Sequence, residues 1–466
     1  MRNYPEQSSR SLLYGWNFCR GDNMSIYDNS YDVIVVGGGP SGVGAGIAAA
    51  RNGANVLMIE KYGFLGGMAT VASVPAYCPY TDGKKLVIRG IGLEVLERLK
   101  SQSYKNPFSD KKEPIKREYD WVPIDQEILK RVLDEIVLES GCKILFHTVV
   151  TDVAVSDGEV TEVWVEDKSG RHSIKGKLII DCTGDADIVF KAGGETEFGD
   201  EEGLVQAVTL CFRIANIDID RFLQYAKDTG ENGNLSRAVE RARSNGDFPF
   251  QEKQVCGFSI QNEGMAGLNF GHVYEVNPLK PEDLTRAEVE SRREIPKLLT
   301  FLRRYVPGLE NAVLASSGPS IGIRETRRII GDYRLTKKDY FNRSLFEDTI
   351  ACYSYPIDVH ASKPRDIVYK NENDEYITSR YKDGEFYGIP YRALLPKGLK
   401  NVIVAGRPLS ADREMHGSFR VMPACFATGQ AAGTAGAICA IEAIGFREID
   451  IEKLRATLIK QGAFLG

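Results

Sequence analysis

The stretch from residue 31 to residue 60 reads as a strand, a glycine turn, a helix, a second strand and an acid. Residues 33–36 are an apolar run without alternation, which is typical of a strand buried on both faces of a sheet. Gly37 permits a tight turn, Gly39 lets the backbone approach a pyrophosphate, and Gly42 lets the following helix lie close to the sheet. The order of these elements therefore predicts a binding site for a dinucleotide.

The helix predicted to begin near Ser41, with Pro40 before it, directs its free N–H groups and the positive end of its dipole at the phosphates. Glu60 follows Gly37 by 23 positions, close to the offset of roughly 20 residues at which an acid binds the ribose hydroxyls. Lys61 stands beside this acid. A second glycine pair can bring further N–H groups to the pyrophosphate, where a threonine adds a hydroxyl; this loop comprises Gly66, Gly67, Met68, Ala69 and Thr70.

With 466 residues the chain is too long for one ordinary core, so we expect two or three domains. The net charge of −5 argues against a general nucleic-acid binder, which needs a basic face. No apolar run approaches the roughly 20 residues of a membrane span. Residues 1–23 lack the apolar core of a secretory signal, and we expect residues 1–30 to be a flexible N-terminal extension outside the fold.

Nine cysteines occur, and none forms a C-x-x-C pair or a cluster with zinc or iron–sulfur spacing. We interpret them as reduced thiols that mostly pack in the core, as in a cytoplasmic protein. This pattern argues against a dithiol reductase and against a built-in iron–sulfur relay, and we expect no metal site.

Asp125 is predicted to cap a helix from about residue 126 to 140, and residues 101–118 before it are expected to be an exposed excursion. Buried strands are predicted at residues 143–150 and 178–181, with a hairpin between them.

Residues 196–395 mix β-like runs with helices near 218–244 and 281–305. Residues 401–406 return to the buried-strand pattern, and a long helix of glycine and alanine follows, as expected where backbone approaches a sheet or a ligand closely. We therefore predict an α/β fold with a discontinuous, Rossmann-like dinucleotide-binding domain that combines a parallel sheet with a β-meander. Its parts are residues 31–195 and 396–466, and the inserted mixed α+β substrate domain is residues 196–395.

At this point the chain resembles a known group of flavoproteins. The glycine fingerprint, residues 64–70, the turn at 182–185 and the strand that ends at Gly406 are similar to FAD-dependent oxidoreductases of the glutathione-reductase-like superfamily. Residues 322–328 and 413–417 resemble, more narrowly, a bacterial FAD-dependent oxidoreductase family related to the flavin part of heterodisulfide reductase. The iron–sulfur cysteines of that enzyme are missing here, so its reaction is not carried over.

The resemblance implies FAD as the dinucleotide. A second bound nucleotide would need a second fingerprint, and residues 90–92 lack the third glycine and follow no buried strand. The resemblance also implies that the backbone of Val149 or Val150 contacts adenine, with plain sheet core as the alternative. The turn and the strand end would line the cofactor through Thr183, Gly184, Asp185, Gly406 and Arg407.

The start of the last long helix, at Val421 and Met422 with Pro423 in its first turn, would stabilise negative charge near flavin N1 and O2. His416 precedes this helix and would lie near the isoalloxazine, as a base that takes a proton while hydride leaves to N5. The alternative is a histidine that only hydrogen-bonds the flavin or packs a loop. Arg420 would bind an anionic substrate or support flavin O2, with a salt bridge as the alternative.

Arg324 lies in a dense charged stretch with Glu325, Arg327 and Arg328. One of these arginines would clamp a carboxylate or hydroxylated substrate with two hydrogen bonds, or else the stretch forms an ion-pair network. Four tyrosines would line the pocket or serve as interface packing: Tyr353, Tyr355, Tyr387 and Tyr391.

We predict a cytoplasmic FAD-dependent oxidoreductase that transfers a hydride between a small organic substrate and flavin N5, with His416, Arg324 and Arg420 as catalytic residues. No nucleic-acid or membrane partner is expected, and a homo-oligomer stays open. The alternatives are a flavin-carrying electron-transfer subunit of a larger redox complex, an RNA-modifying flavoprotein, and a flavin-dependent monooxygenase or halogenase.

Overall fold

The computed structural model describes residues 25–27, 29–103, 114–231, 233–248, 250–252, 254–255, 257–366 and 380–466. Most of the predicted N-terminal extension, 1–30, lies outside these residues, as does much of the predicted excursion at 101–118. Within the described part of that excursion a short helix forms, α3 (Pro114–Tyr119).

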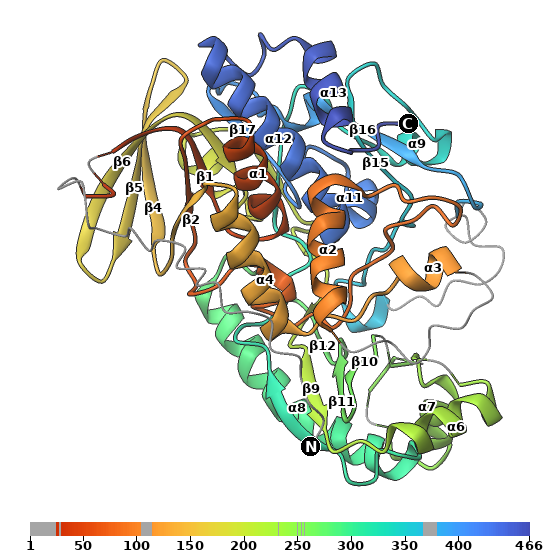
Figure 1. Ribbon diagram of the computed structural model, residues 1–466. Helices are drawn as coiled ribbons and strands as arrows, with labels where there is room; N and C mark the ends of the chain where they lie inside the picture. Colours follow the sequence, from red (N-terminus) through yellow and green to blue (C-terminus); the bar gives the residue numbers. More distant parts are fainter. Residues whose placement is uncertain are drawn as a thin grey trace, which may run out of the picture.

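The central feature is a seven-stranded sheet built from β1 (Ser30–Val36), β2 (Val56–Ile59), β3 (Lys143–Leu145), β4 (Val149–Ser156), β5 (Glu159–Asp167), β6 (Gly170–Asp181) and β17 (Val402–Val404). Strands β3, β2, β1 and β6 lie side by side and parallel, and β17 adds to β6 in parallel. The amino-terminal half of β6 pairs instead with β5, which pairs with β4, in an antiparallel meander. The predicted α/β fold, a parallel sheet with a β-meander, is confirmed (Figure 1).

The prediction of one strand over residues 143–150 is wrong, because two strands, β3 and the start of β4, occupy this range. β3 ends at Leu145, and His147 takes a left-handed backbone conformation with φ of +54°. The N–H groups of His147 and Thr148 donate to the carbonyls of Tyr62 and Glu60. This turn moves the chain from the parallel sheet into the meander, which an apolar run alone does not reveal.

Helices α1 (Pro40–Arg51) and α12 (Met422–Glu442) cross with their backbones in contact, although they come from opposite ends of the chain. An added Cβ at Gly429 would lie 2.1 Å from the Ser41 carbonyl oxygen, and one at Gly433 would lie 2.1 Å from that of Ala45. The glycines of α12 therefore permit this close approach. Further helices around the sheet are α2 (Gly90–Gln102), α4 (Gln126–Glu139), α5 (Asp187–Lys191) and α13 (Ile451–Lys460).

We expect Gly429→Ala to lower the free energy of unfolding by about 1–3 kcal/mol, because the added methyl group collides with the backbone of α1. Gly436→Ala on the same helix is the matched control, since its Cβ would meet only side chains, at 3.4 Å or more. That control should be neutral or gain up to about 1 kcal/mol of helix propensity. Urea unfolding of both variants measures the difference, and equal midpoints would contradict the proposed close contact.

A second hydrophobic core is formed by residues 208–321. Its strands are β8 (Val208–Thr209), β9 (Phe212–Ala215), β10 (Ser259–Asn262), β11 (Met265–Leu268), β12 (His272–Val273) and β13 (Val313–Ser317), and its helices are α6 (Ile219–Thr229), α7 (Ser236–Ser244) and α8 (Pro281–Tyr305). Figure 1 shows this part below the main sheet.

Most of the segment between the second core and β17 packs with the first core, not the second. It holds β14 (Arg327–Ile329), which pairs with β7 (Thr196–Phe198), then α9 (Lys337–Asn342), β15 (Thr349–Tyr353), η2 (Pro364–Asp366), β16 (Tyr387–Pro390) and η3 (Tyr391–Leu394). We therefore propose to shorten the substrate domain, predicted as 196–395, to about residues 208–321.

α12 is long and apolar enough to pass a test for membrane-spanning helices, which corrects the expectation that no apolar run approaches such a length. However, 83% of its apolar window is buried inside the protein, against α1 and the sheet. The glycine and alanine that make the helix apolar here serve close packing.

Candidate active site

The glycine turn between β1 and α1 has two glycines that the chain itself requires. Gly37 has φ of +100°, and a Cβ there would lie 2.4 Å from the Cys182 carbonyl oxygen. A Cβ at Gly42 would lie 1.7 Å from the Gly37 carbonyl oxygen. Gly39 differs, because its backbone is extended and its Cβ would meet nothing nearer than the Cα of Gly67, at 3.7 Å. Space in front of Gly39 is what an approaching pyrophosphate needs, so the turn fits a dinucleotide.

The two helices that lead into the site begin without a side-chain cap. Gly39 precedes α1 and Val421 precedes α12, and neither has a side chain that accepts from the first turn. Helices α2 and α8 also begin without a side-chain cap, whereas aspartates cap α4, α6, α13 and α11 (Arg413–Phe419). Uncapped N–H groups and the helix dipoles favour anions, as expected at Pro40, Ser41, Val421 and Met422 for phosphates and reduced flavin.

Glu60 is buried at the end of β2 and organises the loop. Its carboxylate accepts from Gly38 N at 2.6 Å and from Tyr62 N at 2.9 Å. Burial raises the pKa of Glu60, and these hydrogen bonds partly offset that effect. Lys61 beside it is exposed.

The second glycine loop forms the short helix η1 (Gly67–Ala69) and touches the first loop. A Cβ at Gly67 would lie 2.9 Å from the Gly39 Cα, and Gly66 has φ of +110°. Met68 is half-buried and Ala69 is buried. The hydroxyl of Thr70, predicted to face the pyrophosphate, instead donates to the Leu65 carbonyl at 2.7 Å and closes the loop.

The turn after β6 and the end of β17 meet at the same edge of the sheet. Arg407 donates from Nε to the Gly184 carbonyl at 2.8 Å and from Nη2 to Asp185 Oδ1 at 2.6 Å. Thr183 donates to Asp181, which is buried, and so turns its hydroxyl away. A Cβ at Gly406 would lie 2.6 Å from Ser41 Oγ, so these residues adjoin the start of α1.

Val150 lies in β4 and pairs with Val165, so this structure places it as a strand residue of the meander. Its neighbour Thr148 donates from its N–H to the Glu60 carbonyl at 3.2 Å. The start of β4 therefore borders the loop of the ribose acid, and the adenine contact stays a prediction.

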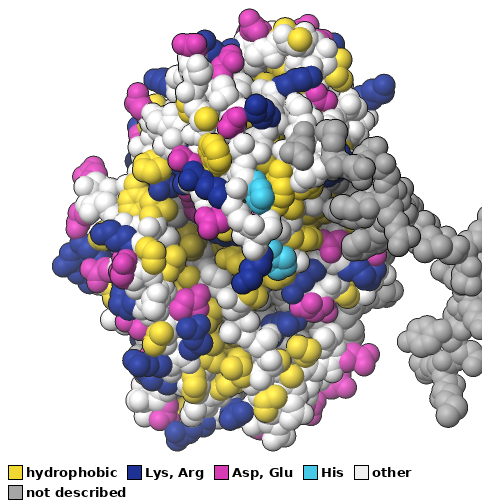
Figure 2. Space-filling view, turned by 90° about the vertical axis from the view of Figure 1, so that its left-hand side faces the viewer, with side chains coloured by type: hydrophobic (Ala, Val, Ile, Leu, Met, Phe, Trp, Pro, Cys, Tyr) yellow, Lys and Arg dark blue, Asp and Glu magenta, His cyan; other side chains and the backbone are white. Residues whose placement is uncertain are grey.

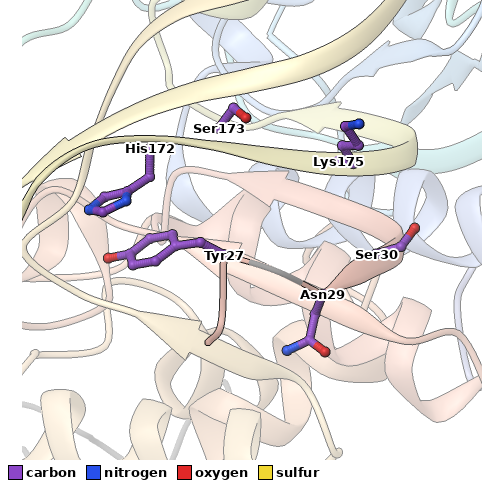
Figure 3. A pocket seen from close by; sticks show the side chains of 6 residues that line it. All are labelled: Tyr27, Asn29, Ser30, His172, Ser173 and Lys175. Atoms are coloured by element: carbon purple, nitrogen blue, oxygen red, sulfur yellow. The ribbon is translucent and has the colours of Figure 1, made fainter. Parts of the chain in front are cut away.

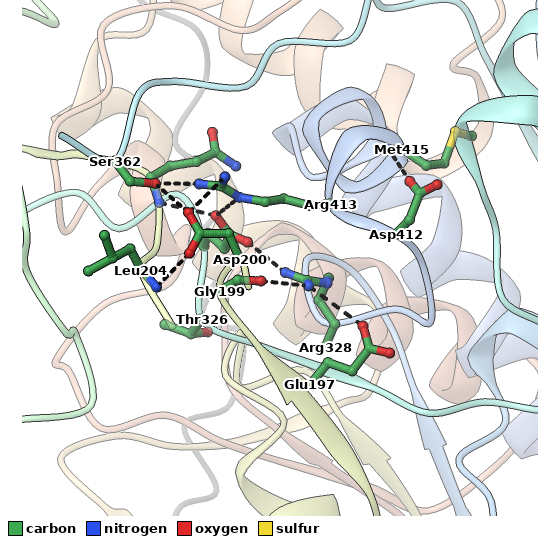
Figure 4. A network of polar contacts seen from close by, with 12 residues as sticks. Glu197, Gly199, Asp200, Leu204, Thr326, Arg328, Ser362, Asp412, Arg413 and Met415 are labelled. Carbon is green, nitrogen blue, oxygen red and sulfur yellow. Dashed lines mark hydrogen bonds and ion pairs between the residues drawn. The ribbon is translucent and has the colours of Figure 1, made fainter. Parts of the chain in front are cut away.

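The charged stretch at 324–328 is largely an ion-pair network, the alternative to a substrate clamp (Figure 4). Glu325 is fully buried and accepts from Arg328 Nη1 at 2.6 Å and from Arg413 Nε at 3.1 Å. Arg413 also pairs with Asp200 at 3.3 Å. Arg327 contacts Asp187 at 3.0 Å, on the side of α5.

Arg324 is buried beside the second core. Its Nη1 donates to the carbonyl of Ala207 at 2.7 Å and to Thr209 Oγ1 at 2.8 Å, and its Nη2 donates to Asn269 Oδ1 at 3.2 Å. Protein oxygens thus hold both terminal nitrogens, which favours an electrostatic role over a clamp on substrate.

His416 lies within α11 and is 0% exposed, so in this arrangement its ring cannot touch a ligand. Neither ring nitrogen has a hydrogen-bond partner among the described residues. Burial lowers the pKa of His416 well below its ordinary value, and nearby arginines, Arg328 first among them, lower it further. The catalytic role predicted for His416 stays untested, and its burial favours another group as the one that meets substrate.

We expect the free energy of unfolding to fall as the pH drops below about 6.5. In that range His416 becomes protonated in the unfolded chain but stays neutral in the folded protein, because burial lowers its pKa. The loss approaches about 1.4 kcal/mol per pH unit for one such group. Urea unfolding at about pH 7 and about pH 5.5 measures it. His416→Leu should show a shallower dependence than the unchanged protein, and identical slopes would remove His416 as a cause.

Arg420 follows α11 and reaches the segment before Ser362. Its Nη2 donates to the Asp358 carbonyl at 3.0 Å and lies 3.4 Å from Asp358 Oδ2, while its buried Nε has no partner among the described residues. The salt bridge given as the alternative for Arg420 is therefore present, and the buried Nε does not meet a ligand in this arrangement.

A cluster that the sequence interpretation missed lies beside Arg420. His272 contacts Glu252 and His360, and His360 faces Asp358. These four residues come from three separated segments with no motif spacing, so only the fold brings them together. Each of the five histidines of the sequence is a weak signal by itself, and no pattern singles out these two.

The four tyrosines mainly serve packing and internal hydrogen bonds. Tyr353, Tyr387 and Tyr391 are buried and bond to the Pro79 carbonyl, the Ser418 hydroxyl and the Phe446 carbonyl. Tyr355 differs, because its hydroxyl donates to Asp358 Oδ2 at 3.3 Å.

A surface hollow of about 430 Å³ lies beside the amino-terminal end of β1 and the amino-terminal half of β6, away from the glycine turn (Figure 3). It is lined by Tyr27, Asn29, Ser30, His172, Ser173 and Lys175. The rings of Tyr27 and His172 stack with centroids 3.9 Å apart, and the Tyr27 hydroxyl donates to Asp167. These contacts hold residues 25–27 on the meander.

The surface around the meander carries both signs of charge, interspersed among its described residues (Figure 2). This face therefore lacks the contiguous basic area that nucleic-acid binding needs. Within the described ranges, no group of three or more His, Cys, Asp or Glu side chains is placed to hold a metal ion. The seven described cysteines are free thiols, and Cys19 and Cys256 lie outside the described residues.

The comparisons with known proteins agree with the fold. The family described as FAD dependent oxidoreductase matches residues 32–458. Digeranylgeranylglycerophospholipid reductase 1 from Methanococcoides burtonii is 29% identical over 163 residues, 34% of this chain and 38% of the reductase. Thiamine thiazole synthase from Methanococcus aeolicus is 28% identical over 262 residues, 54% of this chain and 81% of the synthase.

Among solved structures, a geranylgeranyl bacteriochlorophyll reductase-like protein from Thermoplasma acidophilum superimposes with a TM-score of 0.45 and 14% identity, over 94% of this chain and 84% of its own. We expected resemblance to a bacterial family, but these three relatives come from archaea. The narrower kinship with the flavin part of heterodisulfide reductase stays a prediction.

Proposed function

Because the chain belongs to the FAD-dependent oxidoreductase family and binds FAD, we propose that it transfers a hydride between a small organic substrate and N5 of the flavin. The observation that carries this proposal is the packing of the uncapped start of α1 against the first turns of α12, which also begins without a side-chain cap. Gly429 and Gly406 adjoin Ser41, so one extended cofactor can reach both helices. Phosphates would lie at α1 and the flavin at α12.

The residues present fit FAD at both ends. The open space at Gly39 and the neighbouring Gly67 suit the pyrophosphate, and Glu60 keeps carboxylate lone pairs for the ribose. Near α12, the positive charge of Arg420 would favour flavin O2 or an anionic substrate. When bound, FAD supplies a two-electron acceptor or donor at N5.

The remaining chemistry belongs to side chains. A substrate hydroxyl or amine that loses hydride also loses a proton, so a base must stand near the flavin end. Arg324 and Arg420 place two positive charges there, which favours a substrate with an anionic group. We also propose a cytoplasmic location, which the free thiols support.

The test is an anaerobic screen of the purified, FAD-loaded protein against small hydroxy acids, amino acids and polyols, followed by flavin absorbance. Bleaching by one of these compounds, without another protein, supports direct substrate oxidation. Reduction only by a partner protein would instead indicate an electron-transfer subunit. A product that carries oxygen or halogen, formed only with O₂ and reduced flavin, would indicate a monooxygenase or halogenase.

A further inference from the structure

Four titratable side chains form a line from the second core towards the start of α12. Glu252 Oε1 lies 3.1 Å from His272 Nδ1, and His272 Nε2 lies 3.2 Å from His360 Nδ1. His360 Nε2 then lies 3.5 Å from Asp358 Oδ1. Asp358 in turn contacts Arg420, the residue that leads into α12. The line therefore ends where the flavin is expected.

Exposure changes along this line. The His272 side chain is 7% exposed and that of Glu252 is 14% exposed, whereas His360 and Asp358 are 24% and 38% exposed. Burial still disfavours the charged forms of His360 and Asp358, although both side chains keep an accessible part. A ligand can thus meet the His360 end of the line but not His416.

Two neutral imidazoles carry two protons for the three contacts of the line, and the longest contact, from His360 to Asp358, is the one we leave without a proton. Burial acts to raise the pKa of Glu252, but the contact with His272 holds it below its ordinary value, so the carboxylate is ionised. Because a carboxylate only accepts, His272 carries its proton on Nδ1 and accepts at Nε2. His360 must then donate from Nδ1. His360 Nε2 is then unprotonated, and its lone pair faces Asp358.

We propose, resting on the function proposed above, that His360 is the catalytic base and that His272 and Glu252 form its proton relay. In the oxidation of an alcohol, the C–H bond breaks and its electron pair leaves as hydride to FAD. The O–H proton passes to His360 Nε2, and the O–H electron pair forms the C=O bond. The proton on His360 Nδ1 can then move to His272 Nε2, and that on His272 Nδ1 to Glu252.

The surrounding charges keep the His360 ring unprotonated and thus free to accept a proton, although they also make it a weak base. Burial and the Arg324 guanidinium lower the pKa of His360 to about 3, although Asp358 acts in the opposite direction, so the ring is an unprotonated base at neutral pH. Burial acts to raise the pKa of Asp358, but His360, Arg420 and Arg324 together hold it below its ordinary value. Ionised Asp358 can stabilise the imidazolium formed when His360 accepts a proton. The other titratable groups near this pair are His272, the Tyr355 hydroxyl and the Cys78 thiol.

The first test is His360→Asn in FAD-loaded protein, with His172→Gln on the meander as the control. We expect unchanged FAD occupancy and flavin reduction by substrate that is slower by about 10²–10⁴-fold, the usual contribution of a general base. His272→Gln should slow reduction less and shift its pH profile, because it removes a positioning contact of His360. Full reduction rates in His360→Asn would overturn the assignment.

The second test needs no substrate and reads the protons directly. In ¹⁵N-histidine-labelled protein at about pH 7, the long-range ¹H–¹⁵N spectrum should show His272 and His360 neutral, with the proton on Nδ1 in both. Glu252→Gln should release the His272 tautomer to a mixture, since an amide can also donate. A proton on His360 Nε2 would overturn the relay.

The two failures are distinguishable. If a substrate bleaches the flavin but His360→Asn is as fast as the unchanged protein, the hydride transfer stands and the base is another group. If no small molecule bleaches the flavin, the proposed function fails, and the NMR spectrum still decides whether the hydrogen-bonded line exists as described.

Discussion

Replacing Gly39 by valine should leave the protein folded and weaken its binding of FAD. The backbone at Gly39 is extended, and an added Cβ would lie 3.7 Å from its nearest neighbour, so the fold itself tolerates a side chain there. A bound pyrophosphate does not, because the backbone must approach it closely. We expect affinity for FAD to fall by about tenfold to 100-fold, corresponding to roughly 1–3 kcal/mol of steric cost.

The measurement is FAD occupancy from the visible spectrum, together with circular dichroism and urea unfolding of the FAD-free protein. Gly264→Ala is the matched control, since its Cβ would meet nothing within 4 Å and the residue lies in a turn of the second core. Gly42→Ala makes a different contrast, because its Cβ would lie 1.7 Å from the Gly37 carbonyl oxygen and should damage the fold. Normal FAD binding by Gly39→Val would disprove the phosphate-loop assignment.

The largest effect on stability is expected for Glu325→Ala. This carboxylate is fully buried and pairs with Arg328 and Arg413, so its removal leaves the buried Arg328 guanidinium without its carboxylate at 2.6 Å and leaves half-buried Arg413 paired with Asp200 alone. Breaking a buried ion pair from one side costs about 3–5 kcal/mol. Because Arg413 also opens α11, we expect the variant to unfold at lower urea and to hold FAD less well.

The control for this variant is Glu294→Ala, which breaks a half-exposed pair with Lys297 on α8 and should cost at most about 1 kcal/mol. Urea midpoints of the two variants and the unchanged protein give the comparison. If both variants lose a similar free energy of unfolding, the buried ion pairs of Glu325 stabilise the fold no more than a surface pair does.

The dinucleotide-binding half of the fold could be predicted because local rules decide it. The apolar run of β1, the glycines after it and the cap at Asp125 each act over a few residues, and each element lies where its pattern predicts. The division of residues 143–150 into two strands could not be predicted, because the break depends on the left-handed backbone of His147. Nothing about a histidine in the sequence indicates that conformation.

The end of the site that we propose for catalysis follows from the sequence only in part. Arg420 and the start of α12 follow from their position before a long helix. In contrast, the contact between His272 and His360 joins residues 88 positions apart, and it depends on the pairing of β12 with β8. Closeness to α12 in the sequence favours His416, but α11 turns its side chain into the core.

The contact of α1 with α12 has a consequence for biosynthesis. The helix that would hold the phosphates is made within the first part of the chain, yet Ser41 and Ala45 pack on glycines that leave the ribosome almost four hundred residues later. Until then α1 lacks its partner, and the helix start that we propose for the flavin is not yet made. On this view FAD binds only after nearly the whole chain has left the ribosome. The cofactor then stabilises a fold in which α1 and α12 have already packed together.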